Sequence, residues 1–231
     1  MAVRFWVFNF MKTLDEIAIE TKTDKSSHQH NYCVKYEKYL PFKRDQKIKI
    51  LEIGVFNGSS INMWREYYCN SYVVGIDIDS SCTKYEKIEN NLFVEIGSQI
   101  DSIFLSKVIE KHGSFDLIID DGSHMQSHMI FSFEKLFPAL KNSGVYIVED
   151  TSCSYWNEYG GGLYRSNSSV EYFKSLVDHV NFFGQKLKGD NWYWRREDYQ
   201  VEQLKTYNPH QCRIDIESIT FLNSTILITK R

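Results

Sequence analysis

Short apolar runs alternate with helical patterns through the middle of the chain. The runs predict strands, because they are rich in β-branched residues and bounded by polar turns. The expected strands are 47–55, 71–79, 91–97, 115–120 and 144–150. The expected helices between them are 59–68, which Ser59 would cap, 100–112 and 124–137. Strands that alternate with helices are typical of βαβ units, and therefore of a parallel sheet covered on both faces.

The two ends of the chain follow other patterns. Residues 13–20 and 31–40 have helical spacing, with a polar loop between them, and Pro41 ends the second helix. Residues 151–211 are irregular apart from one expected helix over 170–183. Two extended runs joined by Asn223-Ser224 predict a terminal antiparallel hairpin. We therefore expect an N-terminal extension and helical segment at 1–46, and one α/β domain at 47–231 with a lid inserted at about 151–211.

Composition narrows the class of protein. The chain has 231 residues, is 42% hydrophobic and 25% charged, and has a net charge of -3, which is typical of a folded globular protein and not of a nucleic-acid binder. The first ten residues are apolar but too short to span a bilayer, and they make a poor signal peptide. The five cysteines are scattered and never form a CxxC, so we expect reduced thiols and a cytoplasmic protein.

Polar side chains follow every expected strand. In open α/β sheets ligands bind beyond the carboxyl ends of the strands. Each such side chain alone could belong to a solvated turn, but together they predict a site at one rim of the sheet. They are Glu52 and Gly54, then Asp77 and Asp79, then Gly97, Ser98 and Gln99, then Asp120, Asp121 and His124, and last Glu149 and Asp150.

The glycine pattern indicates the type of ligand. The turn Gly54-Val-Phe-Asn-Gly58 lacks the central glycine of a dinucleotide fingerprint, and no P-loop lysine is present, which argues against an NAD-dependent oxidoreductase. An acid at the end of the second strand suits the ribose of a nucleoside without phosphates, and the Gly54 turn suits an amino-acid group. S-adenosylmethionine has both parts, and the acidic rim suits its sulfonium cation.

Four motifs carry a family resemblance: LEIGVFNGSSINMWREYY, VVGIDID, FDLIIDDGSHMQSH and GVYIVEDTSCSYW. Together with TDKSSHQHNYCVKYEKYL they resemble the class I S-adenosylmethionine-dependent methyltransferases, and more narrowly the metal-dependent macrolide-sugar (mycinamicin-type) O-methyltransferases. The likeness covers roughly residues 21–156. It implies a Rossmann-like, mostly parallel seven-stranded sheet with a C-terminal antiparallel hairpin and helices on both faces. The long N-terminal auxiliary domain of the macrolide enzymes is missing, so their acceptor and assembly are not carried over.

The resemblance also implies the roles of the catalytic residues. Asp121, Glu149 and Asp150 match the family's metal ligands, and carboxylates suit Mg²⁺ or Mn²⁺. His124 matches the general base that would take a proton from a metal-chelated sugar hydroxyl. The sequence S-x-x-Q at 123–126 predicts a capping box that places His124 in the first helical turn, where the helix dipole favours the neutral imidazole.

Other residues complete the expected site. Cofactor contacts are expected from the side chains or turns of Glu52, Gly54, Asp77, Ser98, Gln99, Asp120, Thr23 and Lys25. Acceptor contacts are expected from Tyr155, Trp156, His128, Trp192 and Arg195. For His128 a structural role is the alternative, for the 192–196 cluster an aromatic core patch or subunit interface, and for residues 23–25 a plain capping loop.

The predicted function is methyl transfer to a hydroxyl of a sugar, either nucleotide-linked or part of a polysaccharide or natural product. The alternatives are a methyltransferase for a catechol-like or phosphorylated metabolite, and a non-catalytic scaffold that binds S-adenosylmethionine. A small sugar-containing acceptor is the expected partner, with no nucleic acid and no membrane span. A homo-oligomer, taken as a dimer, is expected from family habit.

Overall fold

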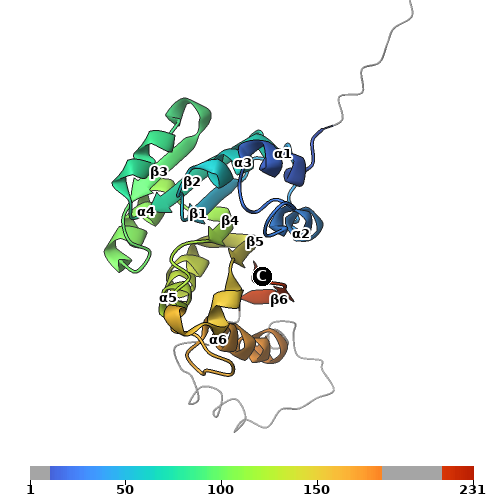
Figure 1. Cartoon of the computed structure of the whole chain (residues 1–231), viewed down its shortest axis with the longest axis vertical. Helices are drawn as coiled ribbons and strands as arrows, with labels where there is room; N and C mark the ends of the chain where they lie inside the picture. The colour runs from blue at the N-terminus through green and yellow to red at the C-terminus, as the bar shows by residue number, and fades with distance from the viewer. Residues whose placement is uncertain (1–10, 184–214) are drawn as a thin grey trace, which may run out of the picture.

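A seven-stranded mixed sheet organises the chain (Figure 1). The computed structural model describes residues 11–183 and 215–231, and its strand order is β3-β2-β1-β4-β5-β7-β6. Strands β1 to β5 pair in parallel, whereas β7 runs antiparallel to both β5 and β6. The strands are β1 (Lys49–Ile53), β2 (Tyr72–Asp77), β3 (Leu92–Ile96), β4 (Phe115–Asp120), β5 (Leu140–Val148), β6 (Ile216–Leu222) and β7 (Thr225–Lys230). This confirms the expected sheet and its terminal hairpin.

Helices lie on both faces of the sheet, as expected. They are α1 (Leu14–Thr21), α2 (Tyr32–Tyr39), α3 (Ser59–Tyr67), α4 (Ser102–His112), α5 (Gln126–Leu136) and α6 (Ser169–Ser175). Short 3-10 turns are Ser80–Tyr85, Ile88–Asn90, Phe137–Ala139, Thr151–Tyr155 and Asn157–Tyr159. The expectation that Ser59 caps α3 is wrong: Gly58 is the N-cap, and the side-chain oxygen of Asn57 accepts the backbone N–H of Ser59 at 3.0 Å.

The period-2 geometry of the strands divides the core into two layers, because successive side chains point to opposite faces. On one face Ile50 and Val73 pack with Trp64 of α3 and with residues of α1 and α2. On the other face Leu51 and Val74 pack with α4, α5 and α6. The N-terminal helices are therefore part of the main core, although the sequence suggested an appended segment.

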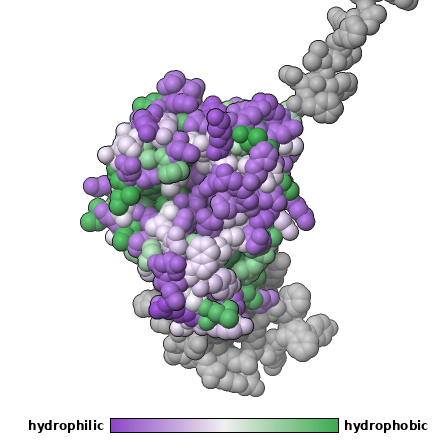
Figure 2. Space-filling view, viewed as in Figure 1, coloured by the Kyte–Doolittle hydropathy of each residue, from purple (hydrophilic) through white to green (hydrophobic). Residues whose placement is uncertain are grey.

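The segment after β5 is only partly regular. One helix was expected over 170–183, but the structure has α6 and, after a break, a single π-helical turn at His179–Phe183. The remainder of the expected lid, residues 184–211, lies outside the described residues. Across residues 11–183 and 215–231, no helix combines the length and apolar character needed to span a bilayer. Figure 2 shows mostly hydrophilic residues on the visible face, with hydrophobic ones in scattered groups.

The strand order reverses between β1 and β4, and this is where a doubly wound sheet leaves a crevice for a ligand. Gly54 follows β1 there with a φ of 97°, and its backbone N–H donates to the carbonyl of Ile76 at 2.8 Å. A Cβ on Gly54 would lie 2.1 Å from the carbonyl oxygen of Asp121. Only glycine permits both this conformation and this close approach.

We expect Gly54→Ala to destabilise the protein more than Gly160→Ala, measured as the free energy of unfolding in urea. Gly160 also has a positive φ, 77°, but a Cβ there would meet nothing within 4 Å. The control should therefore lose only the conformational term of about 1–2 kcal/mol. Gly54→Ala should lose this amount plus the cost of moving the backbone at Asp121. Equal losses would show that the close approach of β1 and β4 has no energetic consequence.

Candidate active site

The loop between β4 and α5 presents Asp121 and His124 to the crevice. His124 has a φ of 57°, which is outside helical geometry, and α5 begins only at Gln126 with Met125 as its N-cap. The predicted capping box is therefore wrong. The hydroxyl of Ser123 instead lies 2.7 Å from Nδ1 of His128, and the side-chain oxygen of Gln126 accepts hydrogen bonds from Ser154 and Ser169. His124 therefore does not lie in the first helical turn, contrary to the prediction.

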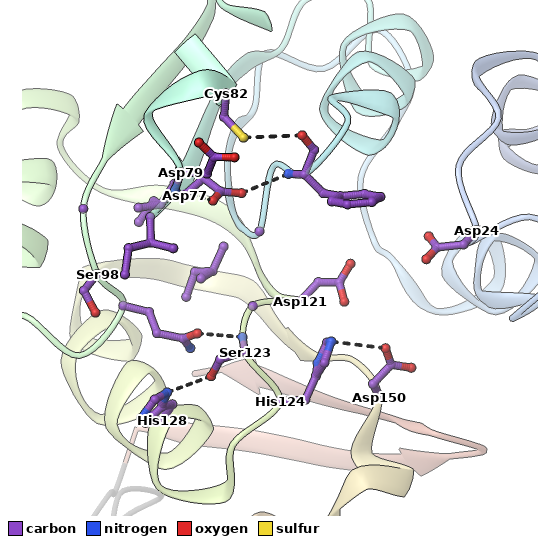
Figure 3. Close-up of a pocket in the computed structure, with 18 residues that line it drawn as sticks. Asp24, Asp77, Asp79, Cys82, Ser98, Asp121, Ser123, His124, His128 and Asp150 are labelled. Atoms are coloured by element: carbon purple, nitrogen blue, oxygen red, sulfur yellow. Dashed lines mark hydrogen bonds and ion pairs between the residues drawn. The ribbon is translucent and has the colours of Figure 1, made fainter. Parts of the chain in front are cut away.

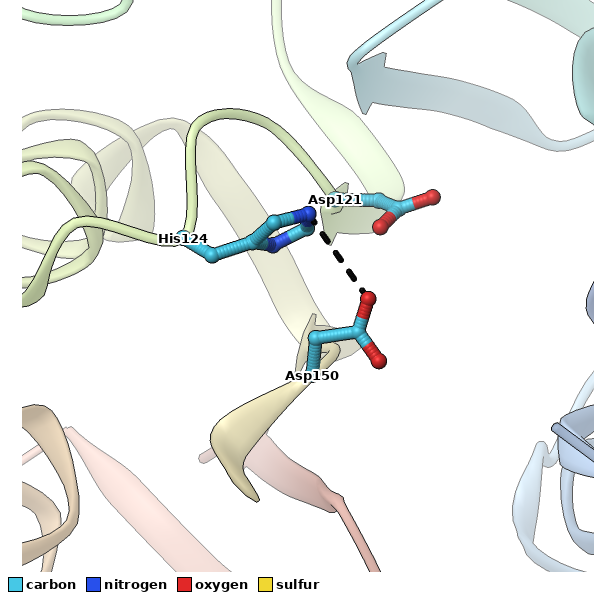
Figure 4. Close-up of side chains that lie close together, drawn as sticks. All are labelled: Asp121, His124 and Asp150. Carbon is cyan, nitrogen blue, oxygen red and sulfur yellow. Dashed lines mark ion pairs between the residues drawn. The ribbon is translucent and has the colours of Figure 1, made fainter. Parts of the chain in front are cut away.

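Asp121, His124 and Asp150 converge at the ends of β4 and β5 (Figure 4). One ligand atom from each lies within 4.8 Å of the others. Nε2 of His124 is 3.7 Å from Oδ2 of Asp150, whereas Nδ1 is buried and has no hydrogen-bond partner among the described residues. Asp150 also has a positive φ, 50°. Two non-glycine residues held in this sparsely populated region at one site are typical of functional geometry.

Behind this group lies a buried ion cluster around Lys25. The Lys25 ammonium contacts Asp121, lies 2.6 Å from Glu149 and lies 3.6 Å from Glu52. Lys25, Glu52 and Glu149 are each at most 1% exposed. Lys25 was expected to contact the cofactor, but the structure directs its ammonium to these carboxylates. Glu149, expected as a metal ligand, is engaged at both oxygens, because Tyr36 donates to Oε1 at 2.6 Å.

Burial sets the protonation behaviour of this cluster. Desolvation alone would lower the pKa of Lys25, but Asp121, Glu149 and Glu52 outweigh it and raise the pKa well above its usual value. Desolvation raises the pKa of Glu149 and Asp121, with Lys25 opposing that shift. Burial also raises the pKa of Glu52 to about 7. The carboxylates thus crowd together more negative charge than one ammonium balances.

A cleft with a volume of about 490 Å³ opens beside these residues (Figure 3). Gly54, Asp77, Asp79, Ser98, Gln99, Asp121, His124, His128 and Asp150 are among its lining residues. Asp77 already accepts backbone N–H groups from Val55, Phe56 and Asp79, each at 2.9 Å. The Cys82 side chain adds a further hydrogen bond to this carboxylate, which faces the cleft. The expected contact of Asp77 with a ribose stays a prediction.

Several expected cofactor residues have structural roles in the wall of the cleft. Gln99 is 8% exposed, donates to Ser132 at 2.9 Å and accepts the backbone N–H of Ser123 at 2.8 Å. Asp120 is buried behind it and accepts from Gln99 and Tyr146, each at 3.3 Å. Ser98 lines the cleft. Glu52 accepts from Ser60 at 2.6 Å, and its Oε2 has no partner among the described residues.

A smaller polar cavity of about 240 Å³ continues past Gly54 and Asp121. Its walls include Thr23, Asp24 and Lys25 on one side and the turn after β1 on the other. The two cavities share Asp24, Gly54, Phe56 and Asp121 in their linings. Together they form an elongated site with a larger end at Asp77 and a small polar end at Thr23.

The expected acceptor residues are placed unevenly. Tyr155 and Trp156 follow Asp150 and are half exposed at 49% and 50%. His128 lines the cleft but is bonded to Ser123, which favours the structural alternative. Trp192 and Arg195 lie outside the described residues. Tyr159 was not predicted as a site residue, but its ring centroid lies 6.1 Å from that of His124 and 6.0 Å from that of Trp156.

Tyr32 and Tyr36 were likewise not predicted as site residues. The hydroxyl of Tyr32 donates to Oδ1 of Asp150 at 2.5 Å, just as Tyr36 donates to Glu149. The sequence signal was present, since tyrosines spaced i, i+4 share a helix face.

The residues at this site fit a divalent cation. Two carboxylates are suitable donors for Mg²⁺ or Mn²⁺, and the neighbouring carboxylates leave a negative excess for a cation to balance. Asp121 and Asp150 would hold such an ion directly, and His124 is close enough to be a ligand or a base.

Sequence relatives of this chain include O-methyltransferases of natural products. No protein-family model matches the chain. The chain is 37% identical over 180 residues to L-olivosyl-oleandolide 3-O-methyltransferase of Streptomyces antibioticus, covering 73% of this chain and 46% of that protein. It is 32% identical over 187 residues to mycinamicin VI 2''-O-methyltransferase of Micromonospora griseorubida, covering 77% and 46%. The chain spans about half the length of the curated relatives it matches.

A solved structure gives the same result. MycE methyltransferase from the mycinamycin biosynthetic pathway, in complex with Mg and SAH, superposes with a TM-score of 0.78 and 26% identity, over 96% of this chain and 55% of that one. The fold is therefore that of the class I S-adenosylmethionine-dependent methyltransferases, as the motifs predicted. Within this class the chain is homologous to the sugar O-methyltransferases of macrolide and tetracenomycin pathways.

The buried Asp120 gives a prediction about stability and pH. Desolvation raises its pKa from 3.8 to about 7, although the Gly122 backbone N–H and the Tyr146 hydroxyl oppose the shift. Between these two values the folded state binds more protons than the unfolded state, so stability falls as pH rises through this window. We expect Asp120→Asn to gain stability relative to wild type from pH 5 to pH 7, by up to about 1.4 kcal/mol per pH unit.

Urea unfolding of both proteins at pH 5, 6 and 7 measures this gain. Asp45→Asn, at an exposed position, controls for the removal of one acidic group. Parallel pH profiles for Asp120→Asn and wild type would contradict the assignment.

Proposed function

We propose that the protein transfers a methyl group from S-adenosylmethionine to a hydroxyl of a sugar-containing acceptor, with the help of a divalent cation. The observation that carries this proposal is the convergence of Asp121, His124 and Asp150 at the mouth of the 490 Å³ cleft. Its support is the fold shared with a methyltransferase solved with Mg and SAH and the sequence likeness to O-methyltransferases of glycosylated natural products.

In this proposal the cofactor follows the long axis of the two cavities. Adenosine occupies the larger end, where the Asp77 carboxylate faces the cleft and Ser98 lines the wall. The amino-acid part lies across Gly54 toward the polar end beside Thr23. The glycine lets a ligand approach the backbone, because no side chain stands in its way.

Asp121 and Asp150 are proposed to hold the cation. Glu149 would join them as a third carboxylate only if the cation displaced the Lys25 ammonium from its Oε2. A cation bound there would acidify a nearby acceptor hydroxyl. His124 accepts the hydroxyl proton, and the oxygen then attacks the methyl carbon while the methyl–sulfur bond breaks. Proton transfer by such a base typically contributes ~10²–10⁴-fold, and fixing two bound reactants contributes ~7–11 kcal/mol, so orientation is the larger effect.

Trp156 and Tyr159 form an aromatic wall next to His124, which suits an acceptor that stacks a sugar ring against it. This wall favours a sugar over a phosphorylated metabolite. A catechol-like acceptor would also suit an aromatic wall, so it remains the second candidate. Assembly as a homo-oligomer stays a prediction.

Calorimetric titration tests the function directly. We expect S-adenosylhomocysteine to bind, and a glycosylated macrolide or a GDP-, UDP- or dTDP-sugar to bind only with Mg²⁺ or Mn²⁺. If S-adenosylhomocysteine does not bind, the class of reaction is wrong. If it binds but the cation changes no acceptor titration, the metal-assisted sugar mechanism is wrong.

His124→Asn separates the two roles open to His124. As a base, its loss should lower turnover of any acceptor by ~10²–10⁴-fold and leave the affinity for Mn²⁺ within about threefold. A loss of Mn²⁺ affinity as large as the loss of turnover would make His124 a metal ligand instead. His28→Asn, at an exposed position outside the cleft, is the matched control.

A further inference from the structure

The N-terminal helical segment supplies a donor to each of three carboxylates in the candidate metal site. Lys25 contacts Asp121 and Glu149, Tyr36 donates to Glu149, and Tyr32 donates to Asp150. These donors come from one stretch of 12 residues, 25–36, that lies about a hundred residues before its acceptors in the chain. The metal carboxylates are therefore oriented by a segment that carries none of the expected metal ligands.

Tyr32 has the most direct relation to the site. It is 1% exposed, and its ring packs on those of His30 and Tyr36 with centroid distances of 5.2 and 6.2 Å. Its hydroxyl is therefore held in place before it meets Asp150. By contrast Tyr39, at the end of the same helix, is 40% exposed and is bonded to none of these carboxylates.

The hydrogen bond from Tyr32 gives the two carboxylate oxygens of Asp150 different partners. Oδ1 accepts from Tyr32 at 2.5 Å, while Oδ2 faces His124 at 3.7 Å (Figure 4). A carboxylate is free to rotate about its last bond unless one oxygen is held. Fixing Oδ1 therefore fixes the direction in which Oδ2 points, toward the space shared by Asp121 and His124. Partners that orient metal-binding carboxylates in this way contribute strongly to metal affinity.

We propose that Tyr32 is a positioning residue that orients Asp150 for the divalent cation. Tyr36 holds Oε1 of Glu149, whose Oε2 contacts the Lys25 ammonium. This inference rests on the proposed function, because it requires the site to bind a cation. If the inference is right, residues 25–36, which precede the first strand, form part of the wall of the active site. The alternative for Tyr32 is a purely structural core residue whose hydroxyl matters only for stability.

Tyr32→Phe tests this by removing one oxygen atom and leaving the ring. Mn²⁺ binding is measured by the electron paramagnetic resonance signal of free Mn²⁺, and S-adenosylhomocysteine binding by calorimetry, on the full chain. We expect Tyr32→Phe to weaken Mn²⁺ binding ~10–100-fold. The affinity for S-adenosylhomocysteine should stay unchanged. Tyr39→Phe is the matched control, and Tyr36→Phe shows whether Glu149 belongs to the metal site.

The outcomes separate the inference from the function on which it rests. Wild-type Mn²⁺ affinity in Tyr32→Phe would overturn the positioning role alone. Parallel loss of Mn²⁺ and S-adenosylhomocysteine binding would show a structural role and also overturn it. If the wild-type protein binds S-adenosylhomocysteine but no Mn²⁺, the metal assistance in the proposed function fails, and the inference fails with it.

Discussion

The buried ammonium of Lys25 is the interaction on which the site depends. Glu52, Glu149 and the inner part of Asp121 lie where water cannot solvate them, and an unpaired carboxylate in such a place is very costly. Lys25 offsets part of this cost, but only if residues 22–31 pack onto the carboxyl ends of the strands. The packing of the N-terminal segment and the burial of these carboxylates therefore depend on each other, because each is unfavourable without the other.

The sheet fixes the positions of the strand ends that carry these carboxylates. The reversal of strand order between β1 and β4 opens the crevice, and the glycine at position 54 lets the two strand ends come close together. Asp121 and Asp150 then follow the neighbouring strands β4 and β5, so their carboxylates meet at one edge. A site of this kind needs rigid strand ends on one side and hydrogen-bond donors on the other, and here the donors come from α2 and the loop before it.

Much of the fold could be read from the sequence. The strands at 115–120 and the hairpin at Asn223-Ser224 follow from local composition, and the pairing of β4 with β5 follows from the βαβ rule. The prediction of the cap at Ser59 and of the capping box at 123–126 failed for a common reason. Ser59 and Ser123 are both good local capping candidates. The backbone, however, takes a left-handed conformation at Gly58 before α3 and at His124 before α5, and this changes where each helix starts. Long-range contacts, such as that of Gln99 with Ser123, decide such turns.

The sequence by itself determined where a site would lie, because carboxylates and a histidine directly after apolar strands must gather at one rim of a parallel sheet, and the resemblance of its motifs to methyltransferases indicated the kind of chemistry. It determined the candidate residues Asp77, Asp121, His124 and Asp150 for the same reason. Only the tertiary structure decided which of these groups contact one another and which face the cleft. It turned Lys25 and Glu149 toward each other, left His124 outside the helix and brought Tyr32 to Asp150, which lies 118 residues further along the chain. Such pairings depend on which helix packs over which strand end, and no local pattern in either segment encodes that.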